Sequence, residues 1–189
     1  MNKGFRLAEI ISGGQTGADQ GGLLAAQDLG IPTGGTAPQG WLTENGPQEA
    51  LLRSFGLVEC AESGYSARTH NNVLHADGTL LVGQYRSGGS GFTARIAREA
   101  GKPLFHLAYV PNLGIVPNER MEEFRYWLER YNIHILNVAG NRESNSPGIQ
   151  ELTRSFLLAA LGKPRLFDVR FQQSRYPGGR RNSIDCMTS

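Results

Sequence analysis

The sequence has few cysteines and no long apolar segment, and both absences narrow the class of protein. Two cysteines among 189 residues exclude a disulfide scaffold and a four-cysteine zinc site. No run approaches the roughly 20 apolar residues of a membrane helix, and residues 1–6 lack a signal-peptide pattern. We therefore expect a soluble, cytoplasmic protein in a reducing compartment, without a membrane partner.

Glycine is abundant, and charge is unevenly distributed along the chain. The 25 glycines are nearly twice the usual share of about 7% and follow no collagen repeat, so they serve turns and close approaches. Residues 163–189 carry six basic and two acidic side chains, which leaves residues 1–162 with a net charge of −2. Nucleic acid is therefore not expected as a partner, except through the basic tail.

Apolar runs and amphipathic segments alternate between residues 7 and 162. The apolar runs predict strands at residues 7–11, 79–82, 103–110 and 133–138, with a weaker one at 56–60. The periodic segments predict helices at residues 16–29, 65–75, 92–100, 119–131 and 149–161. Gly101 suits a left-handed helix end, and Ser146 with Pro147 suits a helix start. This alternation predicts one α/β domain, a Rossmann-like three-layer fold with a mostly parallel sheet.

The predicted domain spans residues 1–162, and residues 163–189 form a basic C-terminal extension. Residues 166–171 are apolar enough to add an edge strand. Residues 172–189 are polar and rich in arginine and glycine, so we expect them to be partly disordered.

Three predicted strand-to-helix junctions are rich in small and polar residues, at 12–19, 87–95 and 137–144. All such junctions of a parallel sheet lie along its carboxyl edge, where ligands bind. Glycines there let main-chain N–H groups turn toward an oxyanion at a helix N-terminus. Each junction also has a purely structural interpretation: a tight turn with an acid that offsets the helix dipole, or a solvated Arg–Glu pair.

Several familiar motifs are incomplete. Gly89, Gly91 and Ala94 fit the G-x-G-x-x-A dinucleotide pattern, but no acidic residue lies between positions 104 and 116, which argues against an NAD dehydrogenase. A phosphate-binding P-loop motif is absent, and Phe92 breaks the G-x-S-x-G elbow around Ser90. The four histidines are dispersed, so we predict no protein-ligated metal site and assign no catalytic residue.

The S-G-G-Q-T-G-A-D sequence at 12–19, the N-V-A-G-N-R-E-S sequence at 137–144 and the glycine-rich segment 87–95 together resemble the molybdenum carrier family. This family of molybdenum cofactor carrier-like proteins is the circularly permuted YpsA-like branch of the SLOG superfamily. The resemblance covers about residues 7–162 and implies a Rossmann-like fold and a homo-oligomer. It also implies binding of molybdenum cofactor (molybdopterin), molybdate or a nucleotide. The family's G-G-W-C-P-K-G-R segment is G-G-T-A-P-Q-G-W here, at 34–41, without its cysteine, lysine and arginine.

The candidate ligand-binding residues come from the three junctions and from the predicted helix 65–75. They are Gly13, Gly14, Gln15, Thr16, Asp19, Arg68, Asn72, Ser87, Gly88, Gly89, Ser90, Gly91, Thr93, Gly140, Arg142, Glu143 and Ser144.

Two further functions stay open beside that of an anion-binding carrier. The superfamily includes Lonely Guy-type nucleotide phosphoribohydrolases, but Arg95 stands at the position of their catalytic glutamate. N-glycosidic cleavage needs a carboxylate, which Glu143 or Asp19 would then have to supply. In the third function, that of an interaction protein, the arginine-rich tail would bind an acidic partner, and the association would weaken steeply with salt.

Overall fold

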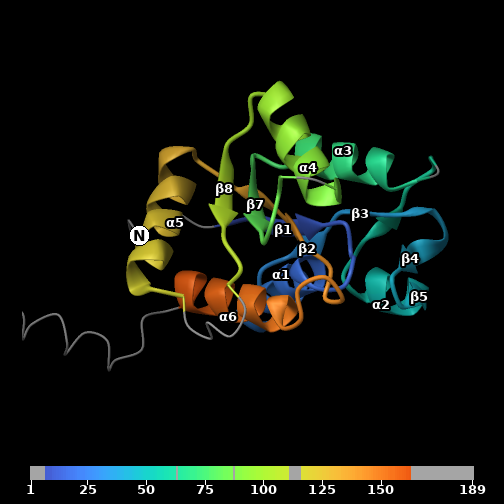
Figure 1. Ribbon diagram of the computed structural model, residues 1–189, viewed down its shortest axis with the longest axis horizontal. Helices are drawn as coiled ribbons and strands as arrows, with labels where there is room; N and C mark the ends of the chain where they lie inside the picture. The colour runs from blue at the N-terminus through green and yellow to red at the C-terminus, as the bar shows by residue number, and fades with distance from the viewer. Residues whose placement is uncertain (1–6, 63, 87, 111–115, 163–189) are drawn as a thin grey trace, which may run out of the picture.

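A five-stranded parallel sheet forms the centre of the computed structural model, which describes residues 7–62, 64–86, 88–110 and 116–162 (Figure 1). Its strands are β1 (Glu9–Ser12), β2 (Thr33–Gly34), β7 (Gly78–Val82), β8 (Leu104–Leu107) and β9 (Ile135–Gly140). They lie in the order β2-β1-β9-β7-β8, and every pair is parallel. The predicted α/β class and parallel sheet are confirmed.

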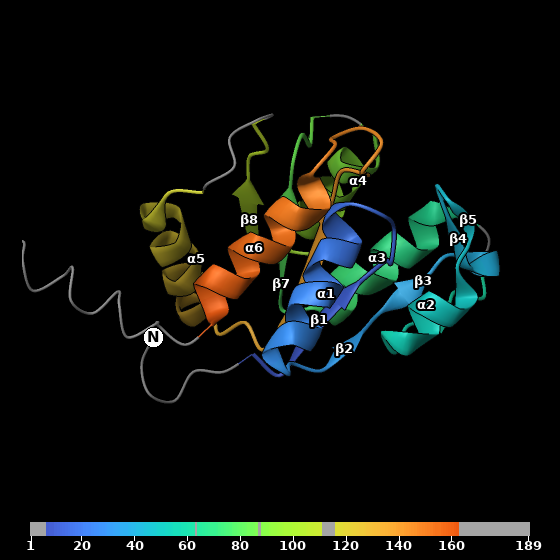
Figure 2. The same ribbon diagram turned by 90° about the horizontal axis from the view of Figure 1, so that it is seen from below.

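Helices cover both faces of this sheet. On one face lie α1 (Ala18–Leu29), α5 (Asn118–Arg130) and α6 (Ile149–Leu161), and on the other lie α3 (Tyr65–His75) and α4 (Gly88–Glu99) (Figures 1 and 2). Leu80 and Val82 of β7 pack toward the first face, whereas Leu81 packs against α4. Because alternate side chains of a strand point to opposite faces, this apolar run covers both sides of the sheet.

A smaller lobe lies beside the β2 edge and is built from residues 36–59. It contains β3 (Thr36–Ala37) paired with β6 (Val58–Glu59), a hairpin of β4 (Leu42–Thr43) and β5 (Gly46–Pro47), a short 3₁₀ turn (Gln39–Trp41) and α2 (Glu49–Ser54). The sequence predicted only loops and the strand at 56–60 here, and it missed α2. The lobe is held by its own small core, in which Trp41, Leu52 and Phe55 pack with Leu23 of α1.

The start of α4 and the cap of α6 differ from the prediction. Helix α4 begins at Gly88 rather than at residue 92, so the glycines form its first turn and not a preceding loop. Helix α6 follows Gly148, and the predicted cap by Ser146 with Pro147 in the first turn is wrong. The left-handed end at Gly101 is confirmed by its φ of 65°. The predicted edge strand at 166–171 and the rest of the extension lie outside the described residues.

Candidate functional site

The carboxyl ends of β1, β9 and β7 bring the three polar junctions to one edge of the sheet. The helix that follows β9 lies on one face, and the helix that follows β7 lies on the other. Neighbouring parallel strands whose connections leave in opposite directions form a crevice where α/β proteins bind ligands. The topology therefore places the candidate site at this edge.

The first junction already uses several of its main-chain donors within the protein. The N–H of Gln15 donates to the Asp19 carboxylate at 3.2 Å, and the N–H of Thr16 donates to the Gln15 side-chain oxygen at 3.1 Å. The N–H of Ala18 donates to the carbonyl of Asn141 at 3.1 Å, which joins the first junction to the third. The hydroxyl group of Thr16 donates to the side-chain carboxylate of Glu44.

Asp19 and Arg68, two of the candidate residues, form a buried ion pair. Arg68 Nη1 lies 3.2 Å from Asp19 Oδ2, and their side chains are 13% and 4% exposed. Burial raises the pKa of the Asp19 carboxyl, and the charge of Arg68 and the N–H of Gln15 offset only part of that rise. The pair fastens α3 to the start of α1.

Gly13 and Gly14, two of the three glycines of the first junction, are required by this internal packing. A Cβ atom on Gly13 would lie 1.6 Å from Arg68 Nη1, so the guanidinium occupies the space above that glycine. Gly14 has a φ of +76°, and a Cβ there would lie 2.7 Å from Leu52 of the small lobe. The glycine pair thus admits Arg68 and Leu52 to the end of β1.

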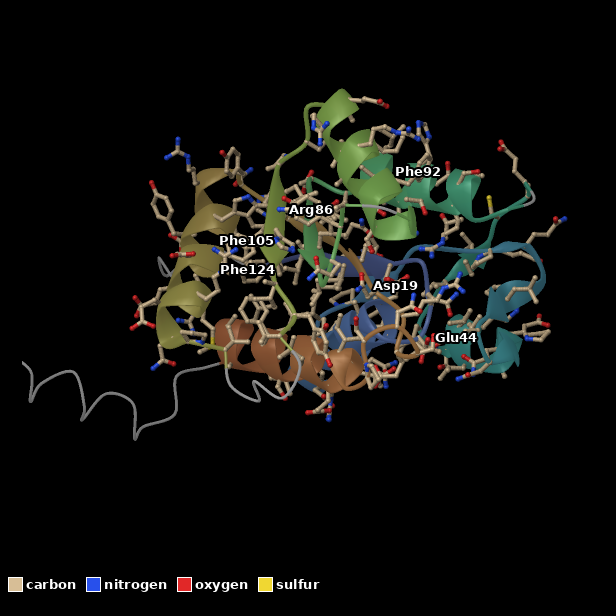
Figure 3. The ribbon with its side chains drawn as sticks, viewed as in Figure 1. Asp19, Glu44, Arg86, Phe92, Phe105 and Phe124 are labelled. Carbon is tan, nitrogen blue, oxygen red and sulfur yellow. The ribbon has the colours of Figure 1, made fainter. Side chains whose placement is uncertain are left out.

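Glu44, at the tip of the β4–β5 hairpin, is a site residue that sequence reasoning missed. Its carboxylate accepts hydrogen bonds from the hydroxyl groups of Thr16 and Ser144 and, at 3.2 Å, from the N–H of Ser144. Its own N–H donates to the Gln15 side-chain oxygen at 2.8 Å. Figure 3 shows Glu44 and Asp19 near the start of α1, away from the Phe105–Phe124 core. A lone glutamate in a loop carries no sequence signal for this placement.

Glu44 is half-buried, and it lines an open depression of about 480 Å³ together with Asn45, Glu143 and Ser144. Burial would raise the pKa of Glu44, but the hydrogen bonds from Ser144 and Thr16 and the charge of Arg142 outweigh it and lower the pKa. The carboxylate is therefore held ionised among hydrogen-bond donors.

Asn141 joins the second junction to the third. Its side-chain amide lies 2.8 Å from the carbonyl of Gln84, 3.2 Å from Ser90 Oγ and 3.0 Å from Ser146 Oγ, with the nitrogen facing Gln84 and Ser90. Gly83, with a φ of +99°, leaves room for this side chain. The sequence motif contained Asn141, but its bridging role depends on the β7–β9 pairing.

The remaining candidate residues divide between internal contacts and open positions. The Glu143 carboxylate accepts the N–H groups of Gly148 and Gln150, so it caps α6. Both polar groups of the Asn72 side chain bond the main chain of Thr36, and the Thr93 hydroxyl donates to Gly89 O.

The small residues at the edge divide in the same way. Gly140 is required by close packing, since a Cβ there would lie 2.2 Å from Val82 O. The space above Gly88 and Gly89 is open. Gly91 lies within α4 and has no positive φ, and a Cβ atom there would lie 3.0 Å from Tyr85 O. Ser87 lies outside the described residues.

The described residues contain no cluster of side chains that could ligate a metal ion. No group of three or more His, Cys, Asp or Glu side chains is placed there to hold a metal ion. Cys60 is buried, and its sulfur accepts from Asn71 Nδ2 at 3.8 Å. Within the same ranges no helix is long and apolar enough to cross a membrane.

The fold and the edge define a Rossmann-like α/β protein with a polar, donor-rich site at the carboxyl ends of its strands. Residues 10–161 match the model of the circularly permuted YpsA SLOG family, and the chain belongs to that family. It is also similar to the crystal structure of a protein from Syntrophus aciditrophicus SB that is named "Putative molybdenum carrier protein". The two are 35% identical with a TM-score of 0.70, over 82% of this chain and 96% of that one. No curated protein matches the chain.

Proposed function

We propose that this protein binds an anionic small molecule at the carboxyl edge of its sheet, with molybdenum cofactor as the leading ligand. The observation that supports this most directly is the set of donors around Glu44. Two hydroxyl groups and one main-chain N–H converge on a carboxylate, with the charge of Arg142 close enough to lower its pKa. Donors arranged in this way also suit the oxygen atoms of a phosphate or of molybdate.

The residues present fit recognition through oxygen atoms. Molybdenum cofactor carries a phosphate group, and molybdate is itself an oxyanion. Cys60 is buried, and its sulfur accepts a hydrogen bond from Asn71, so it is not exposed to a ligand. The ligand would thus be held as cargo by Thr16, Ser144 and Arg142. The similar protein from Syntrophus is named as a molybdenum carrier, and that name supports this choice of cargo.

The nucleotide hydrolase is the weaker alternative. Its two substitute carboxylates are both engaged, Glu143 with the start of α6 and Asp19 with Arg68. Arg95 lies on α4, 4.0 Å from Glu99. These contacts give no support to N-glycosidic cleavage, and base release from AMP tests it directly.

The proposal is tested by calorimetry with molybdate, tungstate, phosphate, AMP and molybdopterin. We expect at least one of them to bind. Ser144→Ala should then weaken binding by about tenfold. This is the lower end of the roughly 1.5–3 kcal/mol that a hydroxyl donor to a charged group is worth, because the same hydroxyl donates to Glu44 in the ligand-free protein. Ser155→Ala is the matched control, since Ser155 is exposed on α6 and bonds Glu151. The proposal fails if none of the five compounds binds the wild-type protein or if Ser144→Ala binds as tightly as Ser155→Ala.

A further inference from the structure

Glu44 reaches the edge from a part of the chain that the junction motifs do not include. The β4 and β5 strands pair only with each other among the described residues. Ser144, which Glu44 contacts, lies 100 positions further along the chain. The carboxylate therefore enters the candidate site as a side chain from a separate lobe.

The contacts of this carboxylate are those expected of a bound oxyanion. It carries one negative charge on two oxygen atoms, accepts from Thr16 and Ser144, and feels the charge of Arg142. A phosphate or molybdate would compete for the same donors. Both cannot occupy them, since two like charges sharing one set of donors repel each other strongly in a partly buried site.

A second observation beneath the hairpin points to a missing acceptor. Gln15 is only 4% exposed, and its side-chain nitrogen has no hydrogen-bond partner among the described residues. Its side-chain oxygen accepts from the N–H groups of Glu44 and Thr16, which fixes the orientation of the amide beside the hairpin. A buried unpaired amide nitrogen destabilises the ligand-free site, and an incoming oxyanion would supply its acceptor.

We propose that Glu44 is a built-in competitor of the ligand, whose carboxylate occupies the oxyanion donors and must swing away before a phosphate or molybdate binds. This inference rests on the proposed function and adds the regulation of the same site. Thr43 and Trp41 are 6% and 5% exposed, and their burial anchors the hairpin. The Glu44 side chain, in contrast, borders the open depression and can turn into it.

The opposite role for Glu44 predicts the opposite result. If its carboxylate instead received a hydroxyl or amino group of the ligand, removing it would weaken binding. With a competitor, the apparent affinity equals the intrinsic affinity multiplied by the fraction of molecules in which the competitor is withdrawn. Removing the competitor therefore strengthens binding. The sign of the change in affinity separates the two roles.

The experiment compares Glu44→Ala and Glu44→Gln with the wild-type chain by calorimetry, with phosphate and molybdate as probes. We expect Glu44→Ala to bind at least one probe about tenfold more tightly, as for a site that is open in about a tenth of wild-type molecules. The gain for Glu44→Gln should be smaller, because the amide oxygen still accepts from Thr16 and Ser144. The melting temperature of the ligand-free variants should fall, because the tie between the hairpin and the edge is lost.

A charge control isolates the carboxylate. Glu122→Ala removes one negative charge from an exposed position on α5 and should bind as the wild type does. Equal or weaker binding by Glu44→Ala, with the wild type binding normally, overturns the inference and leaves the proposed function intact. If the wild type binds none of the five compounds, the proposed function falls and this inference with it.

Discussion

At the scale of single residues, the candidate site depends on side chains that are held by one another. Gly13 leaves space for the Arg68 guanidinium, Arg68 pairs with Asp19, and Asp19 accepts the N–H of Gln15. Gln15 in turn accepts from Thr16 and Glu44. A substitution at Gly13 should therefore disturb the hydrogen bonds of the candidate site, although Gly13 itself has no side chain.

We expect Gly13→Ala to lower the free energy of unfolding by about 3 kcal/mol. The new methyl group would overlap Arg68 Nη1 and displace the guanidinium, which leaves Asp19 buried without its partner. Urea denaturation measures the loss. Gly89→Ala is the control, because the space above that glycine is open and its φ is not positive.

A double-mutant cycle with Asp19→Asn shows where that cost arises. If the broken ion pair is responsible, Gly13→Ala should cost much less in the Asp19→Asn background. The interpretation is wrong if the cost is the same in both backgrounds, or if Gly13→Ala is as stable as Gly89→Ala.

The pH dependence of Glu44 gives a second prediction for a single residue. Its pKa is lowered from 4.5 in the folded protein, so the ionised side chain stabilises the fold above pH 4.5. That contribution is lost as the pH falls through the lowered pKa. The wild type should thus be more stable than Glu44→Gln at neutral pH, and the difference should shrink below pH 4.5.

This difference is measured by urea denaturation of both proteins between pH 3 and pH 7. Asp19, whose pKa is raised by burial, affects stability in the opposite sense, but it is present in both proteins and cancels in the comparison. A difference that stays constant or grows toward acid pH would contradict the assignment of Glu44 as an ionised, donor-bound group.

At the scale of elements, α6 begins differently from the pattern in its sequence. Ser146 and Pro147 have the form of a helix start, yet the first turn is completed by Glu143, five residues before Gly148. The Ser146 hydroxyl lies instead beside Asn141, at 3.0 Å. The Glu143 carboxylate also lies at the positive end of the α6 helix dipole. An acidic residue in the third junction thus fixes where α6 starts.

We expect Glu143→Ala to lower the free energy of unfolding by about 1–2 kcal/mol, the usual cost of a lost helix cap. Glu151→Ala is the matched control: Glu151 lies in the first turn of the same helix, but its carboxylate contacts Arg154 and Ser155. Chemical denaturation of the three proteins measures the difference. If the two variants are equally stable, Glu143 does not cap α6.

At the scale of the whole molecule, the edge is assembled from strands that lie far apart in the chain. Strand β9, near the end of the described residues, inserts between β1 and β7 and brings the third junction beside the first two. The small lobe then adds Glu44 from outside the sheet. Residues 10–161, which match the family model, include these elements from the second residue of β1 onward.

The sequence alone determined the fold class and most of the element types, because burial on both faces of a parallel sheet requires uninterrupted apolar strands between amphipathic helices. Helix α3 was predicted with its observed limits, Tyr65–His75. The small lobe was not predicted, since α2 is six residues long and its core depends on Leu23 from another element.

The tertiary structure alone decided which polar groups meet. Asp19 and Arg68 are 49 positions apart, and Glu44 and Ser144 are 100 apart, so no local periodicity links either pair. Strand order brings these residues together, and strand order follows from how buried faces pack rather than from any local motif. For that reason the sequence identified the edge as the candidate site, whereas only the folded chain brought the Glu44 carboxylate onto its donors.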